Sequence, residues 1–332
     1  MGQVKKILPV ATPPIVSYLH HAYPLSITFT REETLPWFYS NFVQLYYCFQ
    51  EDYFKMNFFA PENIFPLILA TYIDHKLFSR VIKQDIIQFL VDCIDNDIYI
   101  YTYLDEYYVP GRKSFGQVHF KHDTFIFGYD LEERYFNIAG FSHYTYNTST
   151  ISFDALKTAF LYPGPPDDIH LYQWKNTVYE FDKELLRDYI YDYLHANNTF
   201  TRLRIIDSPF KYKHLVWGLR VYDGLVQYIE MLSEKAPGRR DIIPFHVLYE
   251  HKKCMRMRLE YIKKEGYLDN IDDILNTYLS FEEKALVFRN LALKCAVAGT
   301  NIEKIKNRLL SILQNMKPKE EQVLKLLLQK LS

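Results

Sequence analysis

Two histidines at the start of a predicted hairpin are the residues of this chain best placed to do chemistry. Residues 117–141 read as two strands joined by a charged turn, and the first strand opens with His119 and His122. Imidazole exchanges a proton near neutral pH, so a histidine fixed at the end of a strand can act as a general base. We therefore expect an acid–base site at the mouth of this hairpin, with a nucleophile within reach of it.

Acyl transfer by a cysteine needs three groups. A thiol lies at a helix N-terminus, a histidine takes its proton, and a third polar group orients the imidazole. Papain-like enzymes place the helix early in the chain and the histidine on a later strand. His122 suits the second role, and Asn137 on the following strand suits the third, with Asp123 and Asp130 as weaker alternatives.

The position expected to carry the nucleophile holds Ala22, which directly precedes Tyr23-Pro24 at a predicted helix start. No cysteine occurs before Cys48, and Cys48 falls late in a predicted buried helix, where a thiol is typically inert. The chain is therefore either a relative without catalytic activity or a variant in which alanine replaces the nucleophile.

Three further residues are expected to contact substrate: His21, Tyr23 and His119. A metal cluster of His20 and His21 with His119 and His122 is the alternative. Metal sites usually add carboxylates or thiols at tight helical spacing, and the chain has no HExxH motif. We therefore expect neither a metal nor a bound cofactor.

Composition limits the function classes. The chain has 332 residues with 39 basic and 40 acidic side chains, a net charge of −1 that argues against binding to nucleic acid or to a membrane surface. Its four cysteines are widely spaced, and no apolar run is long enough for a signal peptide or a membrane span. These features predict a cytoplasmic protein. The 17% aromatic content is compatible with an aromatic-lined substrate groove or with compositional bias alone.

The periodicity of apolar residues predicts an α+β fold, with helices and an antiparallel sheet first and a mainly helical region after them. The segment PGPPDD at 163–168 is the clearest break, and the strand-like 170–181 that follows is expected to rejoin the first sheet. We expect a papain-like domain over 1–181 and a helical domain over 182–332 that completes or covers its cleft. The predicted strands are 4–10, 98–109, the two of the hairpin, and 170–181; the predicted helices are 24–33, 37–50, 62–73, 79–95, 151–162, 182–197, 214–234, 243–267, 281–298, 301–315 and 320–331.

Several segments resemble one known family. HHAYPLSI, LPWFYSNFVQLYY and HDTFIFGYDLEERYFNIAGF are similar to the family named for the N-terminal region of butirosin-biosynthesis protein H, and VWGLRVYDGLVQYI and FHVLYEHKKCMRMRLEYI fit its C-terminal half. These are papain-like proteins of thiotemplate pathways. The resemblance implies transfer of an acyl or peptidyl group from a carrier-protein phosphopantetheine thioester to an amine, which forms an amide.

Two positions depart from that family. Ala22 stands where the nucleophile is expected, and Ala139-Gly140 stands where related peptidases have an aspartate. We therefore keep three hypotheses: a cysteine-dependent acyltransferase, a catalytically inactive module that binds a carrier protein or peptide, and a cysteine peptidase.

The second half of the chain offers a possible docking surface. The run Lys252-Lys253, with Arg256 and Arg258, could attract an acidic carrier protein. His246 and Glu250, four residues apart, share a helix face and could instead form an ion pair there.

Overall fold

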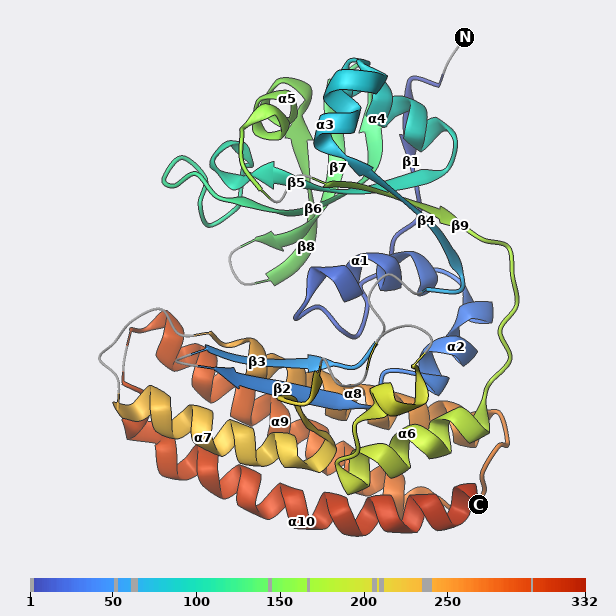
Figure 1. Cartoon of the computed structure of the whole chain (residues 1–332), viewed down its shortest axis with the longest axis vertical. Coiled ribbons are helices and arrows are strands. Elements are labelled where there is room, and N and C mark those ends of the chain that lie inside the picture. Colours follow the sequence, from blue (N-terminus) through green and yellow to red (C-terminus); the bar gives the residue numbers. More distant parts are fainter. Residues whose placement is uncertain are drawn as a thin grey trace. The chain divides into compact units, whose positions relative to one another are not determined.

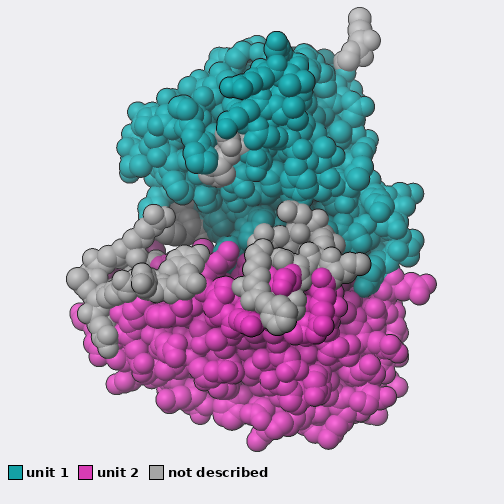
Figure 2. All heavy atoms as spheres, viewed as in Figure 1, with its two compact units in different colours: residues 1–35, 62–179 teal, residues 36–61, 180–332 magenta. Residues whose placement is uncertain are grey.

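The computed structural model describes residues 3–50, 53–60, 65–142, 145–165, 168–204, 208, 212–234, 241–299 and 301–332. The chain forms two compact units: unit 1 holds residues 1–35 and 62–179, and unit 2 holds residues 36–61 and 180–332 (Figure 2). The sequence predicted a single boundary at 181/182. The chain instead enters unit 2 at residue 36, returns at residue 62 and enters unit 2 again at residue 180.

Unit 1 is built on a seven-stranded antiparallel sheet. Its main strands follow the order β4-β9-β5-β6-β7-β8, and β1 pairs with the end of β6 that β5 leaves unpaired. The strands are β1 (Lys5–Ile7), β4 (Ile68–Asp74), β5 (Ile98–Asp105), β6 (Lys121–Asp130), β7 (Tyr135–Ser142), β8 (Thr145–Ser152) and β9 (Asp168–Trp174). The predicted hairpin is β6-β7, and the strand predicted after the proline-rich break is β9, so both predictions are confirmed.

Helices cover both faces of this sheet (Figure 1). On one face lies α1 (Leu19–Thr28), whose Tyr23 ring stacks on Phe125 at 4.9 Å between centroids. On the other face lie α4 (Ile86–Asp95) and α5 (Phe153–Leu161). Phe153 of α5 packs on Phe136, and successive strand residues point to opposite faces, so Phe136 and Ala139 mark the two sides of β7. Short turns of helix complete the unit: η1 (Glu32–Thr34), α3 (His75–Leu77), η2 (Phe78–Ile82) and η3 (Glu106–Tyr108).

The sequence predicted an element most accurately where it contained a helix-capping residue or a regular alternation of apolar and polar residues. The helix predicted over 151–162 is α5, and the hydroxyl of Ser152 caps it by accepting the amide of Ala155. The first helix begins five residues earlier than predicted, at Leu19, and therefore holds Pro24 in its interior. The helix predicted over 62–73 is wrong: residues 62–64 lie outside the described residues, and Ile68–Asp74 pairs with β9 as an edge strand.

Unit 2 combines a small sheet with long helices. Residues 37–50 were predicted to be one helix, but α2 (Leu35–Ser40) ends early, and β2 (Leu45–Gln50) pairs with β3 and β10. The helices predicted over 301–315 and 320–331 form one continuous helix that contains Pro318. The remaining elements are β3 (Tyr53–Phe58), α6 (Lys183–His195), η4 (Thr199–Arg202), β10 (Val216–Trp217), η6 (Gly218–Arg220), α7 (Val221–Glu234), α8 (Ile243–Lys264), α9 (Asp272–Val297), η7 (Ile302–Ile305) and α10 (Lys306–Leu331).

The fold is therefore α+β with antiparallel sheets and a helical C-terminal region, as predicted. Within the described residues, no helix is both long and apolar enough to span a membrane.

Candidate functional site

His119 is held by a buried carboxylate. Its Nδ1 lies 2.6 Å from Oδ2 of Asp105, the last residue of β5, whose side chain is fully buried. The other oxygen, Oδ1, accepts the backbone amides of Phe120 at 2.9 Å and Tyr107 at 3.2 Å. The carboxylate is thereby fixed on both sides, and it fixes the imidazole in turn.

Two aromatic rings restrict the same imidazole without covering it. The His119 ring stacks on Tyr107 at 4.3 Å and on Tyr162 at 4.5 Å between centroids, yet 42% of its side chain remains exposed. Tyr107 belongs to η3 and Tyr162 follows α5, so two separate elements position the ring. This arrangement is ordered and open to a ligand.

The pKa of Asp105 is lowered from its ordinary value. Burial acts to raise it, but the hydrogen bond with His119 and the amides of Phe120 and Tyr107 outweigh burial. The carboxylate therefore stays charged near neutral pH. A charged carboxylate accepts the Nδ1 proton of a neutral imidazole, which leaves the Nε2 lone pair as the proton acceptor.

His122 has a carboxylate neighbour with looser geometry. Its Nδ1 lies 3.3 Å from Oε1 of Glu106, but the two atoms are not aligned for a hydrogen bond. Glu106 also accepts the hydroxyl of Ser114 at 3.2 Å, and the ring of Phe120 stacks on His122. The two histidines thus each have a carboxylate neighbour, Asp105 for His119 and Glu106 for His122. The sequence prediction chose His122 as the base, whereas the geometry favours His119.

The structure does not bring the predicted nucleophile position to His122. Ala22 lies on α1 in the hydrophobic core of unit 1, fully buried, beside Tyr23. Tyr23 marks the face that α1 covers, because it stacks on Phe125. His122 is an odd number of residues from Phe125 and pairs with Leu104, so its side chain points to the opposite face of the sheet.

The predicted orienting residue is also misplaced. Ile126 of β6 pairs with Ile138 of β7. His122 lies four residues before Ile126, and Asn137 lies one residue before Ile138. Because the strands are antiparallel, these two positions lie in opposite directions from the pair, five residues apart along the sheet. The two therefore lie about 17 Å apart along the strands, and on opposite faces. Asn137 cannot orient the imidazole, and its Oδ1 is buried with no hydrogen-bond partner among the described residues.

The predicted substrate contacts have different environments. His21 is buried in α1, where its ring lies 4.2 Å from that of His20 between centroids. Tyr23 is fully buried, and its hydroxyl donates to the main-chain oxygen of Asp123 at 3.0 Å. Of the three predicted contacts, only His119 is exposed.

None of the cysteines replaces the missing nucleophile. Cys48 lies on β2 in unit 2, where burial raises its pKa. Burial also raises the pKa of Cys93 and of Cys254 to about 12, and Cys295 is buried. Thiols whose pKa is raised by burial stay protonated near neutral pH and react slowly.

The small-residue step on β7 has a structural purpose that the sequence did not indicate. The guanidinium of Arg112 donates to the main-chain oxygens of Ala139 and Phe141. A Cβ at Gly140 would overlap that guanidinium. Gly140 therefore makes room for the buried guanidinium of Arg112.

Three of the four residues predicted to form a basic docking surface on α8 are engaged inside unit 2, and Lys253 is half-buried. Lys252 and Arg258 are fully buried, and Arg258 donates to the main-chain oxygens of Tyr39 and Asn41 at the end of α2. Arg256 is paired with Glu260 and Glu282. These cations are already used inside unit 2.

A helix-face ion pair at His246 is not expected either. Burial lowers the pKa of His246 to about 4, with a further contribution from Arg289. The ring is therefore neutral at physiological pH.

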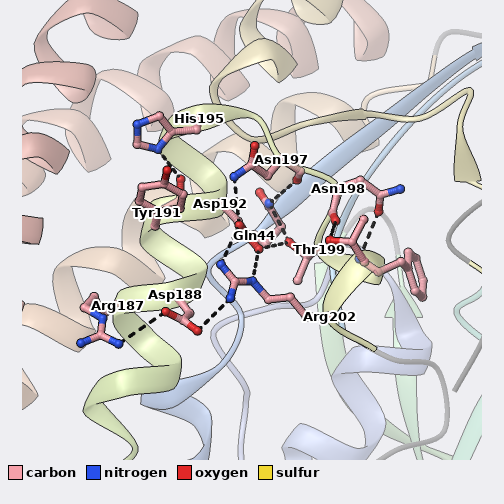
Figure 3. Close-up of polar contacts among 12 residues, drawn as sticks. Gln44, Arg187, Asp188, Tyr191, Asp192, His195, Asn197, Asn198, Thr199 and Arg202 are labelled. Atoms are coloured by element: carbon pink, nitrogen blue, oxygen red, sulfur yellow. Dashed lines mark hydrogen bonds and ion pairs between the residues drawn. The ribbon is translucent and has the colours of Figure 1, made fainter. Parts of the chain in front are cut away.

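Unit 2 contains a polar cluster at the end of α6 (Figure 3). The carboxylate of Asp192 accepts two guanidinium hydrogen bonds from Arg202, the hydroxyl of Thr199 and the side-chain amide of Asn197. Arg202 also pairs with Asp188. Both carboxylate oxygens of Asp192 are engaged, so this cluster fastens η4 to the helix.

Sequence reasoning missed Asp105, Glu106 and Arg112. The pair Asp105-Glu106 was visible as two acidic residues near the end of a predicted strand, a position where side chains commonly face a site. Among the described residues, no group of three or more His, Cys, Asp or Glu side chains is arranged to hold a metal ion. A scan against models of known protein families finds no match, and a search of curated proteins finds none either.

Proposed function

We propose that unit 1 catalyses acyl transfer from a carrier-bound thioester to an amine, with His119 as general base and no covalent enzyme intermediate. The observation that carries this proposal is the 2.6 Å contact between His119 and the buried Asp105, on a ring that stays 42% exposed. A carboxylate-held imidazole with an accessible second nitrogen is the arrangement that general-base catalysis requires.

A thioester needs no nucleophile from the protein, because its carbonyl is already activated. The amine nitrogen attacks this carbonyl and forms the C–N bond. Nε2 of His119 takes the proton that the nitrogen releases. When the C–S bond breaks, the same proton passes to the leaving thiolate, so the products are an amide and a free pantetheine thiol.

The surface beside His119 suits an acyl chain. Phe115, Val118 and Phe120 are exposed large apolar side chains of the segment that leads into β6. Apolar side chains grouped near a catalytic base favour an apolar substrate and displace water from it. The thioester substrate is supported by the resemblance of several segments to the family named for the N-terminal region of butirosin-biosynthesis protein H. The same resemblance supports a papain-like ancestry for unit 1.

The second candidate is a catalytically inactive module that binds a carrier protein or peptide. It is favoured by Ala22, which lies in the core where related enzymes would have a reactive thiol. A cysteine peptidase has no comparable support, since Cys93, the cysteine of unit 1, is buried in the hydrophobic core.

The test is amide formation from an acyl-pantetheine thioester and a panel of primary amines, with product identified by mass spectrometry. The native chain should form amide with its four cysteines alkylated where accessible. His119→Gln should lower the rate by about 10²–10⁴-fold. His195→Gln is the matched control, because His195 is an exposed residue of α6 in unit 2 whose Nδ1 contacts the main-chain oxygen of Tyr191.

Two results would separate the candidates. Amide formation that depends on His119 supports the transferase. Binding of the thioester by the native chain without turnover supports the inactive module and contradicts the transferase.

A further inference from the structure

A row of tyrosines surrounds one carboxylate on the face of the unit 1 sheet that α1 covers. Asp123 of β6 pairs with Tyr103 of β5, and Tyr101 pairs with Phe125 on the same face. Directly paired residues of an antiparallel sheet hold their Cβ atoms about 5 Å apart. Tyr101 also pairs with His170 of β9, so the row crosses three strands.

The rings are in mutual contact. The hydroxyls of Tyr101 and Tyr103 lie 3.0 Å apart, and the Tyr101 ring lies 4.4 Å from His170 between centroids. Tyr72 of β4 adds an edge-to-face contact with His170 at 4.7 Å. The cluster therefore places several aromatic rings on the strands next to the carboxylate.

Asp123 lacks a cationic neighbour of its own. Within the described part of the chain, no lysine or arginine forms an ion pair with it. Burial raises its pKa, while His122 and the hydroxyl of Tyr101 act in the opposite direction. Burial also lowers the pKa of His170, so this nearby ring stays neutral at physiological pH. A partly desolvated carboxylate without a counter-charge is unfavourable, and either a proton or a cation that joins it relieves this cost.

The cluster is not sealed. Asp123, Tyr103 and His170 are each partly exposed, and Tyr72 is exposed. A small ligand thus has access to the carboxylate and to the Tyr103 ring beside it, whereas the Tyr101 ring is buried.

We propose that Asp123 and the surrounding tyrosines form a binding site for an organic ammonium group. The carboxylate supplies the opposite charge, and the face of the partly exposed Tyr103 ring supplies cation–π attraction. This site goes beyond the proposed transfer reaction: Asp123 faces the side of the sheet opposite to His122, and its ligand binds whether or not an acyl group is transferred.

The test is calorimetric titration of the full chain with n-butylammonium and with n-butanol, which has the same alkyl chain and no charge. We expect the ammonium to bind at least tenfold more tightly than the alcohol. Asp123→Asn should weaken ammonium binding at least tenfold. Asp154→Asn is the matched control, because Asp154 is an exposed carboxylate of the same unit at the start of α5.

A second variant keeps the test decisive if Asp123→Asn fails to fold. Tyr103→Leu removes a ring face and should weaken ammonium binding, whereas Tyr103→Phe retains the face and should preserve most of it. Equal binding of ammonium and alcohol, no binding by the native chain, or unchanged binding in Asp123→Asn or Tyr103→Leu would each overturn the proposal.

Discussion

Unit 1 and unit 2 each contain a cation-forming side chain held by a carboxylate, but the two pairs differ in what surrounds them. In unit 1, Asp105 is buried while His119 remains 42% exposed. In unit 2, Lys252 of α8 and Glu320 of α10 are both 0% exposed, with Nζ at 2.6 Å from each carboxylate oxygen. The two pairs therefore differ in exposure: solvent reaches the His119 side chain but not the Lys252 side chain.

The unit 2 pair is satisfied from every direction. Tyr222 and Tyr278 donate their hydroxyls to Glu320 at 2.6 and 3.2 Å. Lys252 also donates to Nδ1 of His251 at 3.1 Å, and Nε2 of His251 donates to the main-chain oxygen of Val43. Burial lowers the pKa of Lys252, and Glu320 opposes that change.

The comparison shows how burial decides the role of a paired cation and carboxylate. A fully buried pair stabilises the fold, whereas a pair with one exposed member can take part in catalysis. A buried polar network with every partner in place fixes the packing of the helices and offers nothing to a ligand. A carboxylate-held imidazole with a free nitrogen is also fixed, but it keeps one group available for proton transfer. The predictions below test this distinction, from the largest expected effect to the smallest.

The largest effect should come from Lys252→Met. The substitution leaves Glu320 buried without its counter-charge, which should lower the free energy of unfolding by about 3–5 kcal/mol. Lys317→Met on α10, the helix that carries Glu320, is the control: Lys317 and Asp223 form a partly exposed pair, and such pairs contribute about 0–1 kcal/mol. Urea denaturation measures both. Equal effects of the two variants would contradict the assignment of the unit 2 network as the structural centre of the bundle.

Gly140→Ala should have an intermediate effect. Gly140 has φ +154°, and an added Cβ would overlap the guanidinium of Arg112. Displacing this buried guanidinium from the Ala139 and Phe141 oxygens should cost about 1–3 kcal/mol, measured by thermal unfolding. Gly116→Ala provides a comparison with positive φ but open space around the Cβ. If both cost the same, backbone strain alone would explain the loss and the role of Arg112 would be refuted.

Asp105→Asn should change how stability depends on pH. The folded pKa of Asp105 is lowered, so its contribution is fully present above the unfolded value of 3.8 and is lost as pH falls through the folded value. The native chain should therefore lose stability below about pH 4 more steeply than Asp105→Asn. Parallel unfolding curves for the two proteins across this range would show that Asp105 is not held as described.

Ala22→Cys should have the smallest effect on chemistry. The introduced thiol would be buried in the core, on the face of the sheet opposite to His122. Incubation with acyl-pantetheine should leave no acyl group on it, and a thiol reagent should modify Cys48 first under native conditions. Rapid acylation of the variant, seen as a mass increase, would revive the covalent mechanism.

Local patterns in the sequence were sufficient where they specified one element. The alternation of β6 and β7 and the capping serine of α5 predicted both elements correctly. The aromatic run at 45–50 was taken for helix because apolar residues at most positions suit a buried helix and a buried strand equally. The segment forms a strand because it pairs with β3 and with β10. The residues of β10 come about 170 positions later in the chain, so a local pattern cannot report this pairing.

The candidate site was predictable only in part, for a related reason. The choice of His119 over His122 as the general base depends on Asp105, which is 14 residues before His119 in the chain. The turn that begins with η3 brings the two side chains together. The face on which Ala22 lies depends on how α1 packs across the sheet. Local periodicity and composition indicate neither the contact between Asp105 and His119 nor the packing of α1 on the sheet.

The most direct test of the central claim is amide formation by His119→Ala with and without added imidazole. If the His119 ring is the base, the variant should lose at least 100-fold in rate and regain part of it as imidazole fills the space between Tyr107 and Tyr162. A variant that forms amide at the native rate without imidazole would contradict the claim.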